Sequence, residues 1–322
     1  MALRILIPAL LLALGAADAR AFTAYVSNEK DNTISVVDLD KMRTVATIPV
    51  GLRPRGILLS ADKKLLYVCA SDSNHVEVVD PNNHQVVRTL PSGPDPESFA
   101  LGHGGDKLYV ANEDNAMVTV LDLRRGAMTE EIPVGVEPEG MAVSPDGRML
   151  IATSETSSMA HLIDLGSLKI VANVLVDSRP RFAAFTPDGK RVWVSSEIAG
   201  SVAVIDTASK QVVKKIGFSV PGLDHSTIQA VGVNIMDDGS TAFVALGPAN
   251  RVAVIDAKTY EVERYLLVGQ RVWHMAFTPD EKYLLATNGL TNDVSVIDVP
   301  ARKVIKTIQV GELPWGVVIS DR

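Results

Sequence analysis

Arginine, carboxylate and tryptophan side chains recur along this chain at a fixed interval, and these residue types could bind a charged or planar ligand. The interval is 42 residues, apart from one step of 50 between Arg181 and Val231. The first set comprises Arg55, Glu97, Glu139, Arg181, Trp273 and Trp315, preceded two positions earlier by Arg53, Arg179 and Arg271. A second set, acidic and in the same phase, comprises Glu29, Glu113, Glu155 and Glu197.

Each residue type in these sets indicates a definite chemistry. Arginine offers paired N–H donors that match the two oxygens of a carboxylate. Tryptophan supplies a flat apolar wall for a planar ligand or a partner loop. Glu97, Glu113, Glu139 and Glu155 could hold a hard cation, or could simply neutralise the arginines. Such pairing should favour the ionised carboxylate and lower its pKa, which would not suit a general acid at neutral pH.

The same period governs the elements that must position these residues. Each unit contains four short apolar runs, and the alternation Val118-Thr119-Val120 is typical of a strand. Turn sequences such as SPDG, at residues 144–147, separate the runs. Seven such units predict an all-β fold, a seven-bladed β-propeller with four antiparallel strands per blade. The first strand of each unit would line the central channel, so both sets should face the channel mouth.

The phase of the repeats also predicts how the ring closes. The chain starts at a second strand, Thr23 to Asn28, and ends at a first strand, Pro314 to Ser320. The last strand should therefore complete the N-terminal blade and remove an exposed edge. An aspartate ends the third strand of every unit, from Asp38 to Asp298. Because a single site does not need seven copies, we interpret this aspartate as a turn residue.

The repeats carry a resemblance to a known family. The segments LYVANEDNAMVTVLDLRRGAMTEEIPVG and YVSNEKDNTISVVDLDKMRTVATIPVG resemble the YVTN family of β-propeller repeats. An exported chain of seven such repeats resembles the propeller proteins associated with catabolism that depends on pyrroloquinoline quinone (PQQ). That second resemblance implies a periplasmic protein that works beside a quinoprotein dehydrogenase or a transporter component.

A single insertion interrupts the ring, at residues 220–228 with the sequence VPGLDHSTI. It places His225 beside the predicted mouth, where His274 is also expected. The inserted loop could be a lid, a docking loop or a tolerated decoration. Two histidines could join the carboxylates in a metal site, although a lone loop histidine is usually only solvated.

The N-terminus and the composition indicate where the protein works. Residues 1–21 have the charged, apolar and small-residue regions of a cleaved signal peptide. We expect export to the periplasm and a mature chain, 22–322, that forms one monomeric propeller without a membrane span. The formal net charge of −7 argues against nucleic acid as a partner. The lone Cys69 cannot form an intrachain disulfide and lies in a strand-like run, where we expect it to be buried.

Several motifs of known enzyme classes are missing from the sequence. There is no C-x-x-C-H for covalent haem, no G-x-S-x-G nucleophile elbow and no phosphate-binding loop. We therefore predict a binding protein rather than an enzyme, accessory to PQQ-dependent alcohol catabolism or transport, which engages a partner protein or small ligand at the mouth. The alternative is a lactonase-like or other hydrolase with a carboxylate-bound divalent metal at the mouth. A carrier of a carboxylated cofactor such as PQQ is the second alternative.

Overall fold

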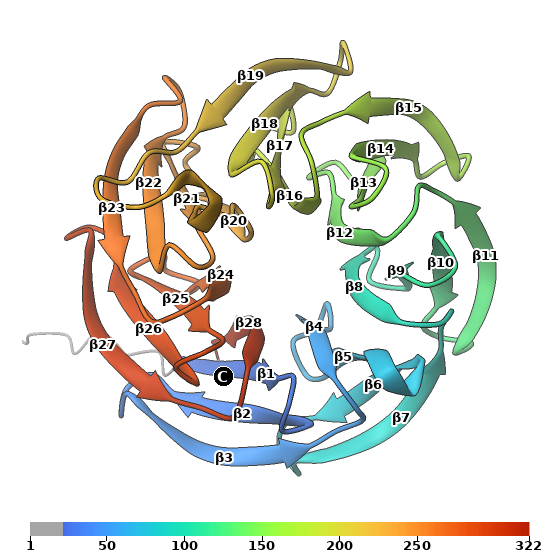
Figure 1. Ribbon diagram of the computed structural model, residues 1–322. Coiled ribbons are helices and arrows are strands. Elements are labelled where there is room, and N and C mark those ends of the chain that lie inside the picture. Colours follow the sequence, from blue (N-terminus) through green and yellow to red (C-terminus); the bar gives the residue numbers. More distant parts are fainter. Residues whose placement is uncertain (1–21, 322) are drawn as a thin grey trace, which may run out of the picture.

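The computed structural model describes residues 22–321, which form seven four-stranded antiparallel sheets around a central axis (Figure 1). This arrangement confirms the predicted propeller. The predicted signal peptide, residues 1–21, lies outside the described residues.

The strands run outward from the axis in chain order within each blade. Blade 1 contains β28 (Pro314–Ser320), β1 (Thr23–Asn28), β2 (Thr33–Asp38) and β3 (Arg43–Pro49). Blade 2 contains β4 (Pro54–Leu59), β5 (Leu66–Ala70), β6 (His75–Asp80) and β7 (Gln85–Pro91). Blade 3 contains β8 (Pro96–Leu101), β9 (Lys107–Asn112), β10 (Met117–Asp122) and β11 (Ala127–Pro133). Blade 4 contains β12 (Pro138–Val143), β13 (Met149–Ser154), β14 (Met159–Asp164) and β15 (Lys169–Leu175).

The remaining three blades follow the same plan. Blade 5 contains β16 (Pro180–Phe185), β17 (Arg191–Ser196), β18 (Ser201–Asp206) and β19 (Gln211–Gly217). Blade 6 contains β20 (Val233–Ile235), β21 (Thr241–Ala245), β22 (Arg251–Asp256) and β23 (Val262–Leu267). Blade 7 contains β24 (Val272–Phe277), β25 (Tyr283–Asn288), β26 (Asp293–Asp298) and β27 (Lys303–Gln309). Two short 3₁₀ turns, η1 (Ser71–Ser73) and η2 (His225–Thr227), complete the described elements.

The core consists of apolar layers between neighbouring blades. The two middle strands of a blade are buried on both faces, as in β9 and β10, and their sequences are nearly continuous apolar runs. The outermost strands alternate between buried and exposed residues, as in β3. Trp193 of β17 packs against Ala242 and Val244 of blade 6 in one of these layers. Such layers fix the angle between blades and so hold the innermost strands around the axis.

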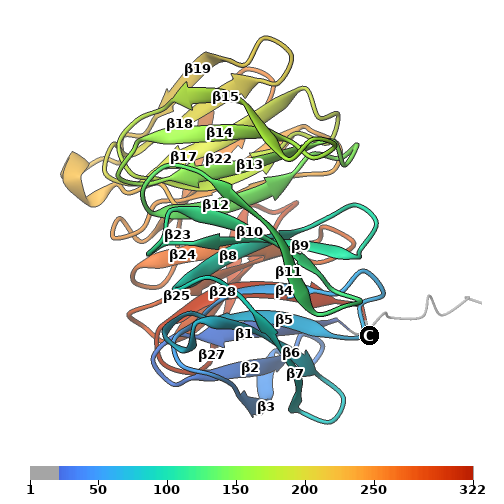
Figure 2. The ribbon, with the colours of Figure 1, turned by 90° about the vertical axis from the view of Figure 1, so that its right-hand side faces the viewer.

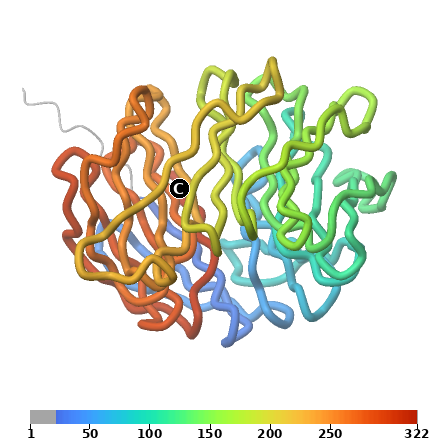
Figure 3. Tube along the Cα trace, turned by 45° about the horizontal axis from the view of Figure 1, so that its top comes forward, coloured from blue at the N-terminus to red at the C-terminus, as the bar shows by residue number. Residues whose placement is uncertain are grey.

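The ring is closed by pairing between the two ends of the described chain. Strand β28 runs antiparallel to β1, with Thr23 opposite Ser320 and Val26 opposite Val317. Figure 3 shows the first and last described segments side by side. The predicted closure is therefore confirmed.

The recurring aspartate is a turn residue in every blade. Asp38 accepts a hydrogen bond from the backbone N–H of Lys41, and Asp298 accepts one from that of Ala301. The equivalent residues Asp80, Asp122, Asp164, Asp206 and Asp256 also accept backbone N–H groups two or three residues ahead. These bonds stabilise the turn into the outermost strand.

The innermost strands approach one another closely where the channel begins. A Cβ on Gly140 of β12 would lie 2.6 Å from the carbonyl oxygen of Arg181 in blade 5. A Cβ on Gly232 would lie 2.7 Å from the carbonyl oxygen of Trp273 in blade 7. Only glycine permits this approach, which brings the side chains of neighbouring innermost strands into contact.

Within residues 22–321, no helix has the length and apolar character needed to cross a bilayer.

Candidate functional site at the channel mouth

The mouth residues are held by the turns that lead into the innermost strands. Six of these turns contain a non-glycine residue in the left-handed region, at Arg53, Asp95, Glu137, Arg179, Arg271 and Leu313. The carbonyl of each accepts a hydrogen bond from the loop between the second and third strands, as in Glu113 N to Asp95 O, 2.9 Å, and Glu155 N to Glu137 O, 2.8 Å. Five of these six residues are charged, so each of these five turns places a charged side chain at the mouth.

Arg53 and Arg55 bind the carboxylates between blades 2 and 3. Arg53 donates to Asp95 and, at 2.6 Å, to Glu97, while its Nε lies 2.8 Å from an oxygen of Asp72. Arg55 donates to Glu97 and, at 3.2 Å, to Glu29. The Glu97 side chain is 0% exposed and receives both arginines. The predicted residues of this sector are therefore together, but they already neutralise one another.

Arg181 is the centre of a second, buried ion-pair cluster. Its guanidinium contacts Glu155 and lies 3.0 Å from Glu139 and 3.7 Å from Glu197. Burial opposes its charge, but Glu139, Glu155 and Glu197 outweigh burial and raise its pKa. The more exposed Arg179 reaches Glu155 at 2.8 Å and Glu197 at 3.2 Å.

An aromatic layer lies beside these charges. Arg271 donates to Glu197 at 2.7 Å, and its guanidinium lies 3.9 Å from the ring centroid of Trp273, in cation–π contact. The ring of Trp315 is 4.0 Å from that of His274, which also meets Phe182 at 5.1 Å. Trp273 is partly exposed, whereas Trp315 is buried.

His274 does not lie on the surface of the mouth as predicted, because its ring is buried in the aromatic layer. Burial, together with the charges of Arg181 and Arg55, lowers the pKa of His274 to about 3. The imidazole is therefore neutral at physiological pH.

The acidic sector of the mouth comprises Asp95, Glu97, Glu113, Glu137 and Glu155. Carboxylate oxygens of Asp95, Glu97 and Glu113 lie within 4.8 Å of one another, and so do those of Glu113, Glu137 and Glu155. Within residues 22–321, neither Glu113 nor Glu137 has an arginine in ion-pair distance. Glu113 is only half-buried, so a ligand can reach it.

Burial and like charges determine the protonation of this sector. Burial, Glu97, Asp95 and Glu155 raise the pKa of Glu113 to about 8. Burial raises the pKa of Glu139 well above its ordinary value, although Arg181 lowers it in part. The expected lowering by arginine occurs at Glu197, where Arg181 and Arg271 outweigh burial. For Glu139 the expectation is wrong because burial outweighs the pairing with Arg181, and for Glu113 it is wrong because burial and neighbouring carboxylates act without an arginine to oppose them.

Asp95 and Glu137 stand in the same phase of the repeat as Arg53 and Arg179, and that phase predicts that they face the mouth. The sequence does not show how close their carboxylates come to that of Glu113. Asp95 meets Glu113 within blade 3, and Glu137 meets it across the boundary between blades 3 and 4.

The inserted loop projects from the mouth face, on the side opposite the C-terminus (Figure 2). Its 3₁₀ turn η2 begins after Asp224, whose carboxylate accepts the N–H of Ser226 at 2.8 Å. His225 is exposed and His274 is buried, and in the described chain the carboxylate triads contain neither histidine. The structure therefore gives no support to a metal site that includes both histidines.

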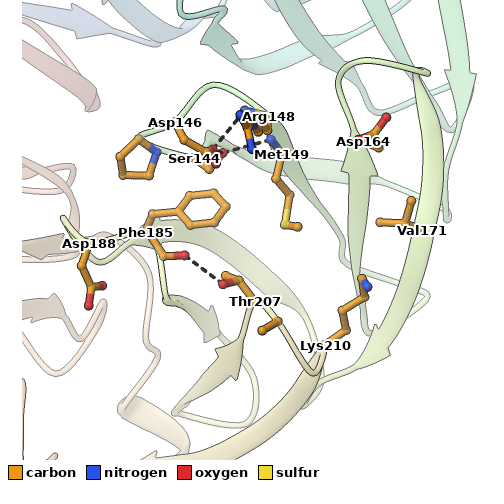
Figure 4. A pocket seen from close by; sticks show the side chains of 13 residues that line it. Ser144, Asp146, Arg148, Met149, Asp164, Val171, Phe185, Asp188, Thr207 and Lys210 are labelled. Atoms are coloured by element: carbon orange, nitrogen blue, oxygen red, sulfur yellow. Dashed lines mark hydrogen bonds between the residues drawn. The ribbon is translucent and has the colours of Figure 1, made fainter.

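A different hollow, of about 610 Å³, lies between blades 4 and 5 at the face opposite the mouth (Figure 4). Ser144, Asp146 and Asp188 line it from the turns between first and second strands, and Phe185 lines it from the end of β16. Similar hollows occur between blades 3 and 4 and between blades 5 and 6. This recurrence indicates a consequence of blade packing rather than a single site.

Two family models match parts of the chain. Residues 165–310 match the model described as "Lactonase, 7-bladed beta-propeller", and residues 63–176 match "Cytochrome D1 heme domain". Each match covers less than half of the chain, so together they support a propeller family in general rather than membership of one of the two. No curated protein matches the chain.

Several solved structures share the fold. The periplasmic gluconolactonase of Pseudomonas aeruginosa is 17% identical, with a TM-score of 0.78 over 93% of this chain and 99% of that one. A putative 6-phosphogluconolactonase from Bacteroides uniformis is 16% identical, with a TM-score of 0.78 over 94% and 100%. Hydrazine synthase of Kuenenia stuttgartiensis is 22% identical, with a TM-score of 0.78 over 86% and 92%. Likeness at this level of identity establishes the fold.

These comparisons correct the functional prediction from the sequence. The expected non-catalytic binding protein is contradicted by the lactonase model and by the lactonase structures among the similar folds. They favour an enzyme, the hydrolase that the sequence left as the alternative. The absence of a nucleophile elbow was a poor guide, because a hydrolase that activates water needs no such motif.

Proposed function

We propose that the protein is a lactone hydrolase whose active site is the acidic sector of the channel mouth. The proposal rests on the environment of Glu113, a half-buried carboxyl without an arginine partner in the described chain. Asp95 and Glu97 flank it on one side, and Glu137 and Glu155 on the other. The match of residues 165–310 to the lactonase model supports the choice of reaction.

Glu113 has the properties of a general base. Its pKa of about 8 places its ionisation close to neutral pH, where a base combines availability with proton affinity. In the proposed reaction, a water oxygen adds to the lactone carbonyl carbon while Glu113 takes the proton. The ring C–O bond then breaks, and the proton passes from Glu113 to the released alkoxide oxygen.

Arginines flank this base and can stabilise the negative charge that develops on the carbonyl oxygen. Arg53 contacts Asp95 and Glu97 of one carboxylate triad, and Arg179 contacts Glu155 of the other. Both guanidiniums are partly exposed, at 24% and 45% of the side chain. Because these guanidinium N–H donors are already oriented before the reaction, they can stabilise the negative charge of the transition state.

The same carboxylates have the donor chemistry for a divalent cation. Hard cations such as Ca²⁺ and Mg²⁺ take carboxylate oxygens, and either triad supplies three carboxylates in one small space. Asp95, Glu97 and Glu113, or Glu113, Glu137 and Glu155, would hold the ion. A bound cation would polarise the lactone carbonyl or lower the pKa of a bound water. Of the predicted metal ligands, Glu139 is the exception, because it belongs to neither triad of the described chain.

The test is lactone hydrolysis by the purified mature protein. Hydrolysis of D-glucono-1,5-lactone would be followed by acid release between pH 6 and 8.5, with the uncatalysed rate subtracted. We expect kcat/KM to rise with pH toward about 8, as Glu113 ionises. Glu113→Gln should lower kcat/KM by roughly 10²-fold or more.

A matched control is Glu281→Gln. Glu281 is another carboxyl whose pKa is raised by burial, but it lies in the turn between β24 and β25, where it accepts the N–H of Asp237 at 2.8 Å. This control should keep the wild-type rate. Absence of turnover with neutral and phosphorylated aldonolactones, with and without Ca²⁺ or Mg²⁺, would refute the proposal.

We further propose that the protein is periplasmic, that its repeats are of the YVTN type, and that it operates in cells that use PQQ-dependent catabolism. The signal-like residues 1–21 support export, and the quoted repeat segments support the YVTN assignment. Fractionation of the natural host, followed by detection of the protein in the periplasmic fraction, tests the location. Recovery in the cytoplasm with residues 1–21 intact would contradict it.

A further inference from the structure

The far half of the channel contains a second cavity, of about 440 Å³, distinct from the mouth. Residues from six of the seven innermost segments line it, in β4, β8, β12, β16, β24 and β28, so it lies on the axis. Within the described chain its lining contains no charged side chain. Leu58, Leu101, Val143 and Val318 are partly exposed, which shows that solvent reaches their side chains.

Buried side chains lie between the mouth and this cavity. Arg181, Glu139 and Glu97 are buried on the mouth side, and the rings of His274 and Trp315 are buried in contact with each other, 4.0 Å between centroids. His274, Trp315 and Phe182 belong to the lining of the far cavity. A molecule in the far cavity would therefore contact the aromatic layer without reaching Glu113.

The chemistry of the lining determines what could occupy it. The side chains are predominantly aliphatic and aromatic, with Met141, Met275 and Phe99 among them. Each innermost strand has a neighbour within its blade on one side only, so its free edge presents backbone N–H and C=O groups toward the axis. A charged ligand would lose its hydration without gaining an ionic partner.

We infer that the far half of the channel is a binding site for a small uncharged molecule with an apolar ring body and one or two hydroxyl or carbonyl groups. The apolar ring of this ligand would pack against the aliphatic and aromatic side chains, and its hydroxyl or carbonyl groups would form hydrogen bonds with the free edges of the strands. The volume lies in the range of small-molecule sites, which are mostly apolar with few polar groups. The site does not depend on the hydrolase proposal, because it shares no charged residue with the acidic sector.

The experiment uses two fluorescent probes that differ by one charge. N-phenyl-1-naphthylamine is uncharged and apolar, and 8-anilino-1-naphthalenesulfonate is the same ring system with a sulfonate. Both probes would be titrated into the mature protein and into two cavity variants, Ala142→Trp, which fills the site, and Leu101→Glu, which puts a charge in it. The control variant is Ala208→Trp, in the hollow between blades 4 and 5.

The proposal predicts saturable binding of the uncharged probe with one site per chain. Binding should weaken by about tenfold or more in the cavity variants that keep the wild-type melting temperature, and should change by less than about twofold in Ala208→Trp. The sulfonated probe should bind at least about tenfold more weakly than the uncharged one. Absence of saturable binding, equal binding of both probes, or loss only in Ala208→Trp would each overturn the proposal.

Discussion

Replacing Glu113 by glutamine should stabilise the protein in a pH-dependent way while it removes activity. The folded protein holds a proton on Glu113 up to about pH 8, whereas an ordinary glutamate loses it near 4.5. Between these values the folded state binds more protons than the unfolded state, so stability falls as pH rises. Glutamine resembles the protonated carboxyl and does not ionise, so the Glu113→Gln variant should not lose stability as the pH rises.

The size of the effect follows from the difference between the two pKa values. At 1.36 kcal/mol for each pH unit, the full difference would correspond to about 5 kcal/mol. Glu113 is only half-buried, and solvent screening reduces such energies strongly, so we expect about 2 kcal/mol at pH 8.5. For a protein of this size that is a rise of roughly 4 °C in the melting temperature.

The assay is thermal melting of wild type and Glu113→Gln at pH 5 and pH 8.5. The two proteins should melt together at pH 5, where Glu113 is protonated, and should differ at pH 8.5. Glu130→Gln, on the exposed outermost strand β11, is the control and should not show this pH-dependent difference. Equal shifts at both pH values, or a variant less stable than wild type at pH 8.5, would refute the reasoning. The predicted combination of greater stability and lost activity is typical of a functional site.

Three further predictions test the closure, the buried charges and the charge of the substrate. Deletion of residues 313–322 removes β28 and exposes the edge of β1, so cooperative melting should be lost and aggregation should follow; an unchanged melt would contradict this. Arg181→Ala leaves Glu139 unpaired in a buried site and removes one of the two arginines that contact Glu155, so it should cost about 3–5 kcal/mol in the free energy of unfolding. Arg191→Ala removes a surface pair with Asp206 and should cost less than about 1 kcal/mol in the same melts. Carboxyl groups outnumber guanidinium groups at the mouth. We therefore expect kcat/KM for 6-phosphogluconolactone to be about tenfold or more below that for gluconolactone at low salt. A preference for the phosphorylated lactone would show that the net charge of the mouth does not govern substrate choice.

Much of the site could be predicted because the repeat period places equivalent residues at equivalent positions around one axis. The period alone brought Arg55, Glu97 and Arg181 to the mouth. It could not reveal that Glu97 is fully buried between two arginines, since that contact crosses from blade 2 to blade 3. Nor could it distinguish Trp273, partly exposed beside Arg271, from Trp315, buried against His274.

The sequence by itself determined the number of blades, the strand that closes the ring and the turn role of the recurring aspartate. These features depend on hydrogen bonds and apolar contacts that each unit repeats, so their pattern is visible in the order of residues. Only the tertiary structure decided that Glu113, half-buried beside other carboxylates and without an arginine in the described chain, holds its proton near neutral pH. Charge and burial act through distances between side chains, and those distances raise the pKa of Glu113 and leave the described lining of the far half of the channel without a charged side chain.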